Sequence, residues 1–222
     1  KFSNNDEVII PTLCWSTSLY PILQMNLKPV FVDISLENLN IDIEKLKKKI
    51  TSKTKAIMLV HALGNCTSMN ELKKLCSNKK ITLIEDCCEA LGSKYDNKYL
   101  GTFGNISTFS FYFSHHITSG EGGLILCNNK EDFKILLSLR AHGWSREVDQ
   151  LNRNKNNKFD KLFNFVNLGY NLRLTDIQAA LLFDQAKKID QFRKNRIFNY
   201  ELILKFFEKI EILNKNLIFV KK

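Results

Sequence analysis

The sequence lacks the features that would place it among membrane or exported proteins. No apolar run approaches the roughly 18 residues that a transmembrane helix needs. The first ten residues, KFSNNDEVII, also lack the basic, apolar and small-residue regions of a signal peptide. We therefore expect no membrane partner. The chain begins with Lys1 rather than Met, so we also expect these 222 residues to be an excerpt of a longer protein.

The six cysteines lack the spacing of a metal site. None belongs to a CxxC pair, and the adjacent Cys87 and Cys88 could form only a strained vicinal disulfide. Zinc and iron–sulfur sites need clustered ligands, so we expect neither a bound metal nor an iron–sulfur cluster. Cysteine usage of this kind indicates reduced thiols in a cytoplasmic protein.

The sequence also lacks the pattern of a nucleic-acid-binding protein, in spite of a formal net charge of +10. Its lysines are spread over predicted helical faces, as at 47–49, 73–74 and 187–188. Aromatic residues do not alternate with these lysines as they do in a base-stacking surface. We therefore expect no nucleic-acid partner, and a small anionic substrate would use the positive potential equally well.

What is present predicts an α/β fold. Amphipathic helical patterns separate buried runs rich in β-branched residues, and this alternation is typical of a mainly parallel sheet with flanking helices. Two capping boxes, Ser68–Glu71 and Thr175–Gln178, predict helix starts, and a long helix is predicted from about 191 to 209. The predicted strands are 7–10, 29–33, 56–60, 81–85, 107–113, 123–127 and 216–220, and 145–161 is predicted to be a polar loop.

Polar residues follow several of these strands. In open α/β sheets, ligands bind at the carboxyl ends of parallel strands. The residues at or just beyond such ends are His61, Asp86, Ser110 and His115. A carboxylate in this place can hold a cationic partner, although Asp86 could equally cap the segment that follows it. His115 could likewise be a core histidine whose hydrogen bonds are satisfied.

Three segments resemble the DegT/StrS group of nucleotide-sugar aminotransferases. They occur in the family's order and read VIIPTLCWSTSLYPILQMNLKPVFVDISLENLNID, LIEDCCEALGSKYDNKYLGTFGNISTFSF and LGYNLRLTDIQAAL. The resemblance implies fold type I of the pyridoxal-phosphate-dependent transferases. It also implies a cofactor-binding large domain at 1–190 and the start of a small domain at 191–222. The family's N-terminal phosphate-binding loop has no counterpart before Asp6, which again predicts an incomplete chain.

The resemblance assigns a role to each matching residue. Asp86 would pair with the protonated pyridine nitrogen of the cofactor, and Trp15 would lie against the cofactor ring. Ser110 would donate to the cofactor phosphate, and Asn171 would reach the phosphate of the neighbouring subunit in a homodimer with shared active sites. Glu89 would lie near the phenolic oxygen of the cofactor, where many aminotransferases have Gln.

The departure from the family lies in the segment FSFYFSHHITSGEGG, residues 109–123. Aminotransferases of this group carry their Schiff-base lysine at the position of His115. An imidazole has no primary amine and cannot condense with the cofactor aldehyde. This replacement resembles a branch of 3-dehydratases that act on nucleotide-linked 4-keto-6-deoxyhexoses. These enzymes hold pyridoxamine 5′-phosphate without a covalent bond. The resemblance implies that His115 would serve as the catalytic base in this chain.

The resemblance implies further partners. Some of these dehydratases bind an iron–sulfur cluster through cysteines that would follow Cys127, and none follows it here. The type without a cluster regenerates the amine form from an amino-acid donor such as glutamate. The substrate would be a nucleotide-diphosphate sugar, and the product would enter deoxysugar and surface-polysaccharide (lipopolysaccharide) biosynthesis.

Other interpretations remain open at this point. The chain could be an aminotransferase-like protein of the same family, or a catalytically silent partner subunit or fragment. A metal site at His115 and His116 is disfavoured, because adjacent side chains in a strand point to opposite faces. The sequence leaves open the nucleotide, the sugar stereochemistry and the roles of His116, His142 and Arg146.

Overall fold

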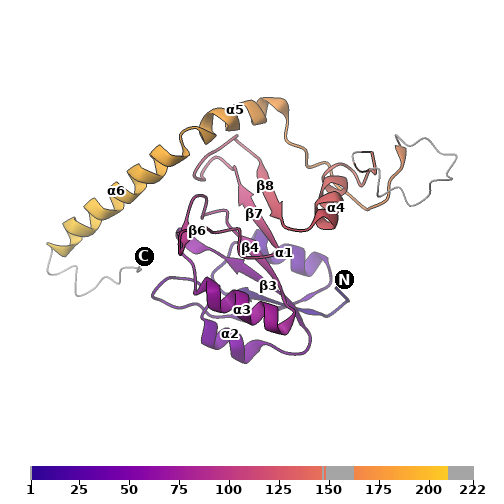
Figure 1. Cartoon of the computed structure of the whole chain (residues 1–222), viewed down its shortest axis with the longest axis horizontal. Helices are drawn as coiled ribbons and strands as arrows, with labels where there is room; N and C mark the ends of the chain where they lie inside the picture. The colour runs from indigo at the N-terminus through magenta and orange to yellow at the C-terminus, as the bar shows by residue number, and fades with distance from the viewer. Residues whose placement is uncertain (1, 147, 149–162, 210–222) are drawn as a thin grey trace. The chain divides into compact units, whose positions relative to one another are not determined.

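The computed structural model describes residues 2–146, 148 and 163–209 (Figure 1). The chain divides into two compact units, residues 1–126 with 180–222 and residues 127–179. The predicted division into domains 1–190 and 191–222 concerns a longer protein and stays a prediction. The predicted strand at 216–220 and most of the predicted loop at 145–161 lie outside the described residues.

A six-stranded sheet forms the core of the first unit, in the order β2-β1-β3-β4-β7-β8. β1 pairs in parallel with β2 and β3, β3 with β4, and β4 with β7. The carboxyl ends of these five strands therefore lie at one edge, which confirms the predicted parallel sheet. The bounds are β1 (Glu7–Pro11), β2 (Lys28–Val32), β3 (Thr54–Val60), β4 (Thr82–Asp86), β7 (Ile106–Ser110) and β8 (Gly123–Cys127).

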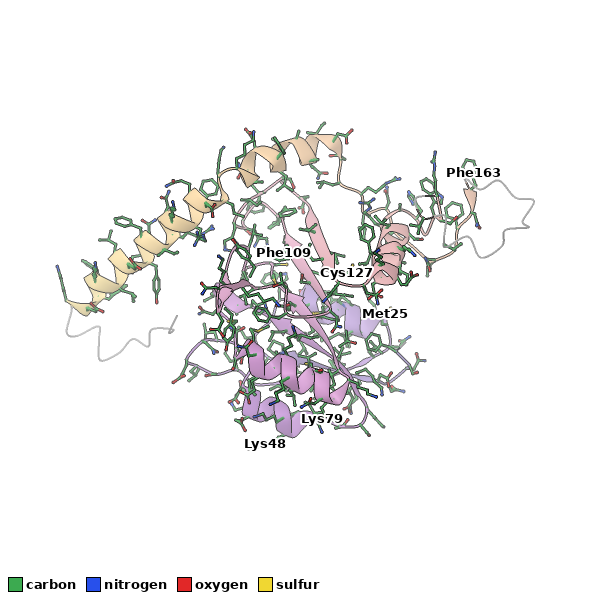
Figure 2. The ribbon with its side chains drawn as sticks, viewed as in Figure 1. Met25, Lys48, Lys79, Phe109, Cys127 and Phe163 are labelled. Carbon is green, nitrogen blue, oxygen red and sulfur yellow. The ribbon has the colours of Figure 1, made fainter. Side chains whose placement is uncertain are left out.

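Helices join the first four strands. They are α1 (Ser16–Gln24), α2 (Ile43–Lys49) and α3 (Met69–Lys79), and the labelled Met25, Lys48 and Lys79 in Figure 2 mark where they end. The other elements are a 3₁₀ turn (Ala62–Gly64), α4 (Lys130–Arg140), α5 (Asp176–Ala186), α6 (Ile189–Glu208) and the antiparallel pair β5 (Lys94–Tyr95) and β6 (Lys98–Tyr99). None of the described helices is both long enough and apolar enough to cross a membrane.

The two capping boxes have different outcomes. α5 begins where the second box predicts, and Thr175 and Gln178 exchange hydrogen bonds between side chain and backbone at 3.0 and 3.3 Å. α3 also begins at the predicted place, directly after Ser68, but the Ser68 side chain makes no capping hydrogen bond. The first box therefore predicted correctly where the helix begins, but the capping hydrogen bond that it implies is not formed.

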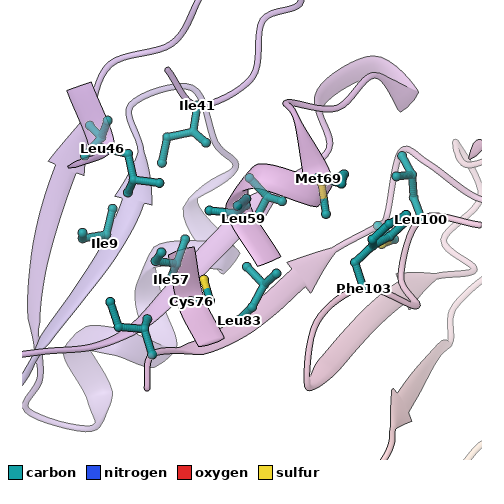
Figure 3. Close-up of a cluster of buried hydrophobic side chains, with 14 of the residues drawn as sticks. Ile9, Ile41, Leu46, Ile57, Leu59, Met69, Cys76, Leu83, Leu100 and Phe103 are labelled. Atoms are coloured by element: carbon teal, nitrogen blue, oxygen red, sulfur yellow. The ribbon is translucent and has the colours of Figure 1, made fainter. Parts of the chain in front are cut away.

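The core is split by the sheet into two clusters, because alternate strand residues point to opposite faces. One cluster packs α2 and α3 against one face (Figure 3), and the other packs Ile22 of α1 against the opposite face. The strand members of the first cluster include Ile9, Ile57, Leu59 and Leu83, and those of the second are Val8, Ile10 and Ala56. The labelled Phe109 in Figure 2 belongs to the first cluster, so its neighbour Ser110 points to the α1 face.

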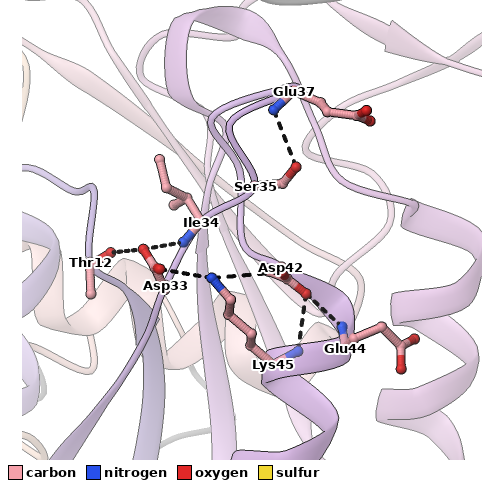
Figure 4. Close-up of polar contacts among 8 residues, drawn as sticks. All are labelled: Thr12, Asp33, Ile34, Ser35, Glu37, Asp42, Glu44 and Lys45. Carbon is pink, nitrogen blue, oxygen red and sulfur yellow. Dashed lines mark hydrogen bonds and ion pairs between the residues drawn. The ribbon is translucent and has the colours of Figure 1, made fainter.

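The loop after β2 shows how this fold neutralises a carboxylate at a strand end (Figure 4). Asp33 follows β2 directly, and its two oxygens accept from Ile34 N at 2.9 Å and from Lys45 Nζ at 2.8 Å. The hydrogen bond from Lys45 is the main reason that the pKa of Asp33 is lowered. Asp42 caps α2 by accepting from the backbone N–H groups of Glu44 and Lys45. Asp33 is therefore held by a lysine from the next helix.

Candidate active site

Asp86 and Ser110 end neighbouring strands and face the same side of the sheet. Asp86 is the last residue of β4 and lies opposite Thr108 of β7. Ser110 comes two residues after Thr108 and is the last residue of β7. Since the side-chain period of a strand is two, both side chains point to the α1 face at the carboxyl edge. The structure thus brings these two predicted site residues together.

The Asp86 carboxylate is held by hydrogen-bond donors of its own unit. Its Oδ2 accepts from Ser18 Oγ of α1 at 2.6 Å, and its Oδ1 accepts from Cys88 N at 3.1 Å. Among the described residues no lysine, arginine or histidine forms an ion pair with Asp86, in contrast to Asp33. A half-buried carboxylate in this setting is suited to a cation brought by a ligand.

Two thiols border the same carboxylate. Burial, the charge of Asp86 and a hydrogen bond to Asp86 together raise the pKa of the Cys88 thiol to about 12. Burial and then the charge of Asp86 also raise the pKa of Cys14. Both thiols therefore stay protonated at neutral pH, which makes them poor nucleophiles there. All six cysteines are free.

Trp15 presents an open aromatic surface beside α1. It is the N-cap residue of α1, has extended backbone angles and is 76% exposed. Its carbonyl accepts from Ser18 N at 3.0 Å, which fixes the first turn of the helix. An exposed indole on an ordered helix start can stack on a planar ring.

The turn after β7 carries the two adjacent histidines. Ser110 Oγ accepts from Tyr112 N at 3.2 Å, which leaves the hydroxyl hydrogen available for an acceptor. His115 N donates to Tyr112 O at 3.1 Å, and the rings of Tyr112 and His115 lie 6.3 Å apart. The His115 side chain is half-buried. Because His115 comes five residues after Ser110, it belongs to the turn that follows the end of β7.

His116 is a neutral histidine at physiological pH. Burial, with smaller electrostatic effects of Arg196 and His115, lowers its pKa to about 4, whereas Glu89 acts in the opposite direction. Its Nδ1 is buried and has no hydrogen-bond partner among the described residues. Glu89 itself accepts from Leu63 N at 2.7 Å. Glu89 is therefore near the histidine pair, and its predicted role at the cofactor's phenolic oxygen stays a prediction.

Asn171 lies in the second unit, within a cationic and aromatic cluster. Its backbone pairs with Ala141, and its Oδ1 accepts from Arg173 Nη2 at 3.1 Å. The same Arg173 nitrogen lies 3.2 Å from His142 Nε2, and Arg173 and Arg146 both lie over the ring of Trp144, at 5.6 and 5.7 Å. The predicted role of Asn171 at a neighbouring subunit stays a prediction.

His61 lies at the carboxyl end of β3, as predicted, but its side chain points away from the face that carries Asp86. His61 follows β3 directly, but its ring is fully buried on the opposite face, where Nε2 lies 2.9 Å from Glu85 Oε2. Glu85 also accepts from the backbone N–H groups of Gly101, Phe103 and Gly104. Burial acts to raise the pKa of Glu85, but the hydrogen bonds from His61, Gly104 and Gly101 outweigh it and hold that pKa below its usual value.

His61, Glu85 and Cys87 could geometrically form a metal site, since one potential ligand atom of each lies within 4.8 Å of the others. However, the Glu85 carboxylate already accepts four hydrogen bonds. Burial, with the charges of Glu85 and Asp86, also raises the pKa of the Cys87 thiol far above neutrality. His61 and Glu85 therefore form a structural network that ties β3 and β4 to the Gly101–Gly104 turn.

Known proteins resemble this chain over nearly its full length. GDP-4-keto-6-deoxy-D-mannose 3-dehydratase of Escherichia coli O55:H7 is 41% identical over 212 residues, which cover 94% of this chain and 55% of that protein. GDP-perosamine synthase of Escherichia coli O157:H7 is 39% identical over 197 residues, covering 88% and 50%. A crystal structure of GDP-4-keto-6-deoxymannose-3-dehydratase with a trapped PLP-glutamate geminal diamine matches with a TM-score of 0.88 at 40% identity, covering 94% and 55%.

The chain spans about half the length of the curated relatives it matches. A family model matches residues 1–217. The fold, with its parallel sheet and flanking helices, is that of the pyridoxal-phosphate-dependent aminotransferase-fold proteins it resembles. The chain belongs to the DegT/DnrJ/EryC1/StrS aminotransferase family.

Proposed function

We propose that the protein containing this chain is a 3-dehydratase of a nucleotide-linked 4-keto-6-deoxyhexose, with pyridoxamine 5′-phosphate as its cofactor and His115 as its catalytic base. The observation that carries the proposal is the imidazole of His115 in the turn after β7, where aminotransferases of the family have a condensing lysine. The relative that is a 3-dehydratase, 41% identical, supports the same reaction.

The residues at the sheet edge fit the cofactor. The Asp86 carboxylate has no cationic side chain paired with it in the described part of the chain, and would hold the protonated ring nitrogen. Trp15 would cover the ring face with its exposed indole, and Ser110 would donate its free hydroxyl hydrogen to the phosphate. When bound, the cofactor supplies an amine for the substrate ketone and a ring that withdraws electrons.

His115 moves the proton in this proposal. One nitrogen of its ring would accept the proton that elimination removes from carbon, and the 3-hydroxyl would leave with the C–O bonding electrons and take up a proton to depart as water. General-base catalysis of this kind contributes about 10²- to 10⁴-fold in rate. His116, with its pKa lowered to about 4, adds no positive charge beside His115 at neutral pH. His115 can therefore accept a proton without repulsion from its neighbour.

The proposal also covers the amine donor, the oligomeric state and the cellular compartment of the protein. The solved relative that holds a PLP-glutamate adduct supports glutamate as the amine donor that regenerates the cofactor. We infer a homodimer in which Asn171 serves the active site of the neighbouring subunit. Six free cysteines, five of them with a raised thiol pKa, suit a reducing compartment such as the cytoplasm.

Amino transfer to a similar sugar is the second candidate, because a GDP-perosamine synthase is 39% identical to the chain. That reaction would leave the C3 hydroxyl on the sugar and add an amine at C4. No lysine stands between Phe109 and Gly123, so this candidate needs amino transfer without the usual lysine.

The test uses the full-length protein with pyridoxamine 5′-phosphate, glutamate and GDP- or CDP-linked 4-keto-6-deoxyhexoses. Mass spectrometry should show loss of the C3 oxygen. His115→Asn should lower kcat by about 10²-fold or more, whereas His116→Asn, the same change one residue away, should cost less than about ten-fold. A product that retains its C3 hydroxyl and gains an amine would favour amino transfer instead.

His115→Lys provides an independent readout. It should let borohydride attach the cofactor to residue 115, found by peptide mass, and should abolish dehydration. The wild-type protein should give no such labelled peptide. Retained dehydration in the lysine variant would count against His115 as the base.

A further inference from the structure

Ser18 makes a buried contact that the proposed mechanism has not used. It lies in the first turn of α1 and is only 4% exposed. Its hydroxyl donates to Asp86 Oδ2 at 2.6 Å, across 68 residues of sequence. The contact joins the element after β1 to the last residue of β4.

We propose that Ser18 is a positioning residue for the cofactor. It fixes the carboxylate that pairs with the ring nitrogen and, through the same helical turn, the tryptophan that covers the ring. This inference rests on the proposed function for what Asp86 and Trp15 bind. It adds a residue to which the family resemblance assigned no role.

The hydrogen bond has the properties of a strong one. A hydroxyl that donates to a carboxylate at 2.6 Å is charge-assisted, and burial of Ser18 shields the contact from water. Cys88 N holds the other oxygen at 3.1 Å. Each carboxylate oxygen has further acceptor capacity, so both donors can orient the group while it still receives the ring nitrogen.

The first turn of α1 couples the two cofactor contacts. Ser18 N donates to the carbonyl of Trp15 at 3.0 Å, so one residue bonds to Trp15 through its backbone and to Asp86 through its side chain. α1 has no acidic residue in its own first turn. Asp86 therefore supplies the negative charge that a helix N-terminus favours. If this turn moved, the contact of Trp15 with the cofactor ring face and the contact of Asp86 with the ring nitrogen would be displaced together.

Ser107 offers a matched control for a merely structural hydrogen bond. It is 1% exposed, lies in β7, and donates its hydroxyl to Gly101 O at 2.8 Å. Its side chain is on the face opposite Asp86, because it is one residue out of phase with Thr108. Ser107→Ala removes a buried hydroxyl of the same size without touching the cofactor edge.

The experiment measures cofactor affinity in the full-length protein by absorbance titration with pyridoxal 5′-phosphate, without nucleotide sugar. Ser18→Ala should weaken binding by roughly 10-fold or more, the range expected for a hydrogen bond to a charged group. Ser18→Cys should fall between wild type and Ser18→Ala, since a thiol is a weaker donor. Ser107→Ala should lower the Tm by about as much as Ser18→Ala does, but should change the affinity for the cofactor less than about two-fold.

The outcomes separate this inference from the proposed function. Wild-type affinity in Ser18→Ala, or an equal loss of affinity in Ser107→Ala, would overturn the positioning role. If wild type binds the cofactor and Ser18→Ala weakens binding, the role of Ser18 stands even when no sugar is dehydrated. That result would contradict the proposed reaction and not the role of Ser18.

Discussion

The direction of single side chains at strand ends determines which polar groups each face of this sheet carries. Val60 of β3 lies opposite Asp86, so His61, one residue further along, points to the other face. The sequence correctly predicts that both residues stand at the carboxyl ends of strands. Their faces depend on the register between β3 and β4, which pairs residues far apart in the chain. For the same reason Ser18 escaped prediction, since its partner lies 68 residues away.

His116 makes stability depend on pH at the residue scale. Its pKa is lowered from 6.5 to about 4 in the folded chain, mainly by burial. Between these values the unfolded chain takes up a proton that the folded chain does not. The contribution is therefore fully present above about pH 6.5 and is lost as the pH falls toward 4, by roughly 1–3 kcal/mol after allowance for partial exposure.

Urea unfolding at pH 7 and pH 4.5 checks this expectation. Because other groups titrate equally in both proteins, the fall in unfolding free energy should be smaller for His116→Gln than for wild type. An identical fall in the two proteins would show that His116 is not protonated preferentially in the unfolded chain.

At the element scale, the distribution of apolar residues was the reliable signal. Buried runs rich in β-branched residues located β1 to β4, whose side chains pack on both faces of the sheet, and amphipathic patterns indicated the helices between them. The predicted strand 107–113 ends at Ser110, because the chain turns there through the contacts of Tyr112. The pair β5 and β6 was missed, because strands of two residues are too short to show a period.

Glu85 joins elements that the sequence does not show to be neighbours. Its carboxylate accepts from His61 and from three backbone N–H groups of the turn at 101–104. Glu85→Gln removes the charge and directs an amide donor at groups that are themselves donors. We expect a loss of about 2–4 kcal/mol in unfolding free energy, since breaking a buried charged network leaves unsatisfied groups.

Thermal unfolding of the variant measures this loss. Glu131→Gln is the matched control, because the Glu131 side chain is 70% exposed and pairs with Lys134 three residues further along α4. It should change the unfolding free energy by less than about 1 kcal/mol. Equal effects of the two substitutions would mean that the Glu85 network contributes little to stability.

At the scale of the whole molecule, the predicted site residues belong to two different units of the chain. Asp86, Ser110 and His115 belong to the first, and Asn171 belongs to the second, where Arg173 holds its side chain. The sequence motif alone could not place Asn171 against a cofactor, because the proposed placement requires a second subunit. A homodimer with shared sites makes a sharp prediction for mixtures of inactive variants.

Co-expression of full-length His115→Asn and Asn171→Asp subunits tests the shared site. If Asn171 serves the neighbouring subunit, each mixed dimer contains one site with both residues intact and one site with both altered. Random pairing should then restore about a quarter of wild-type dehydration. His115→Asn mixed with Asp86→Asn is the control, because both residues come from the same unit of one chain and no mixed site has both intact. If the first mixture stays as inactive as the control, Asn171 acts within its own chain and the proposed dimer does not share its sites.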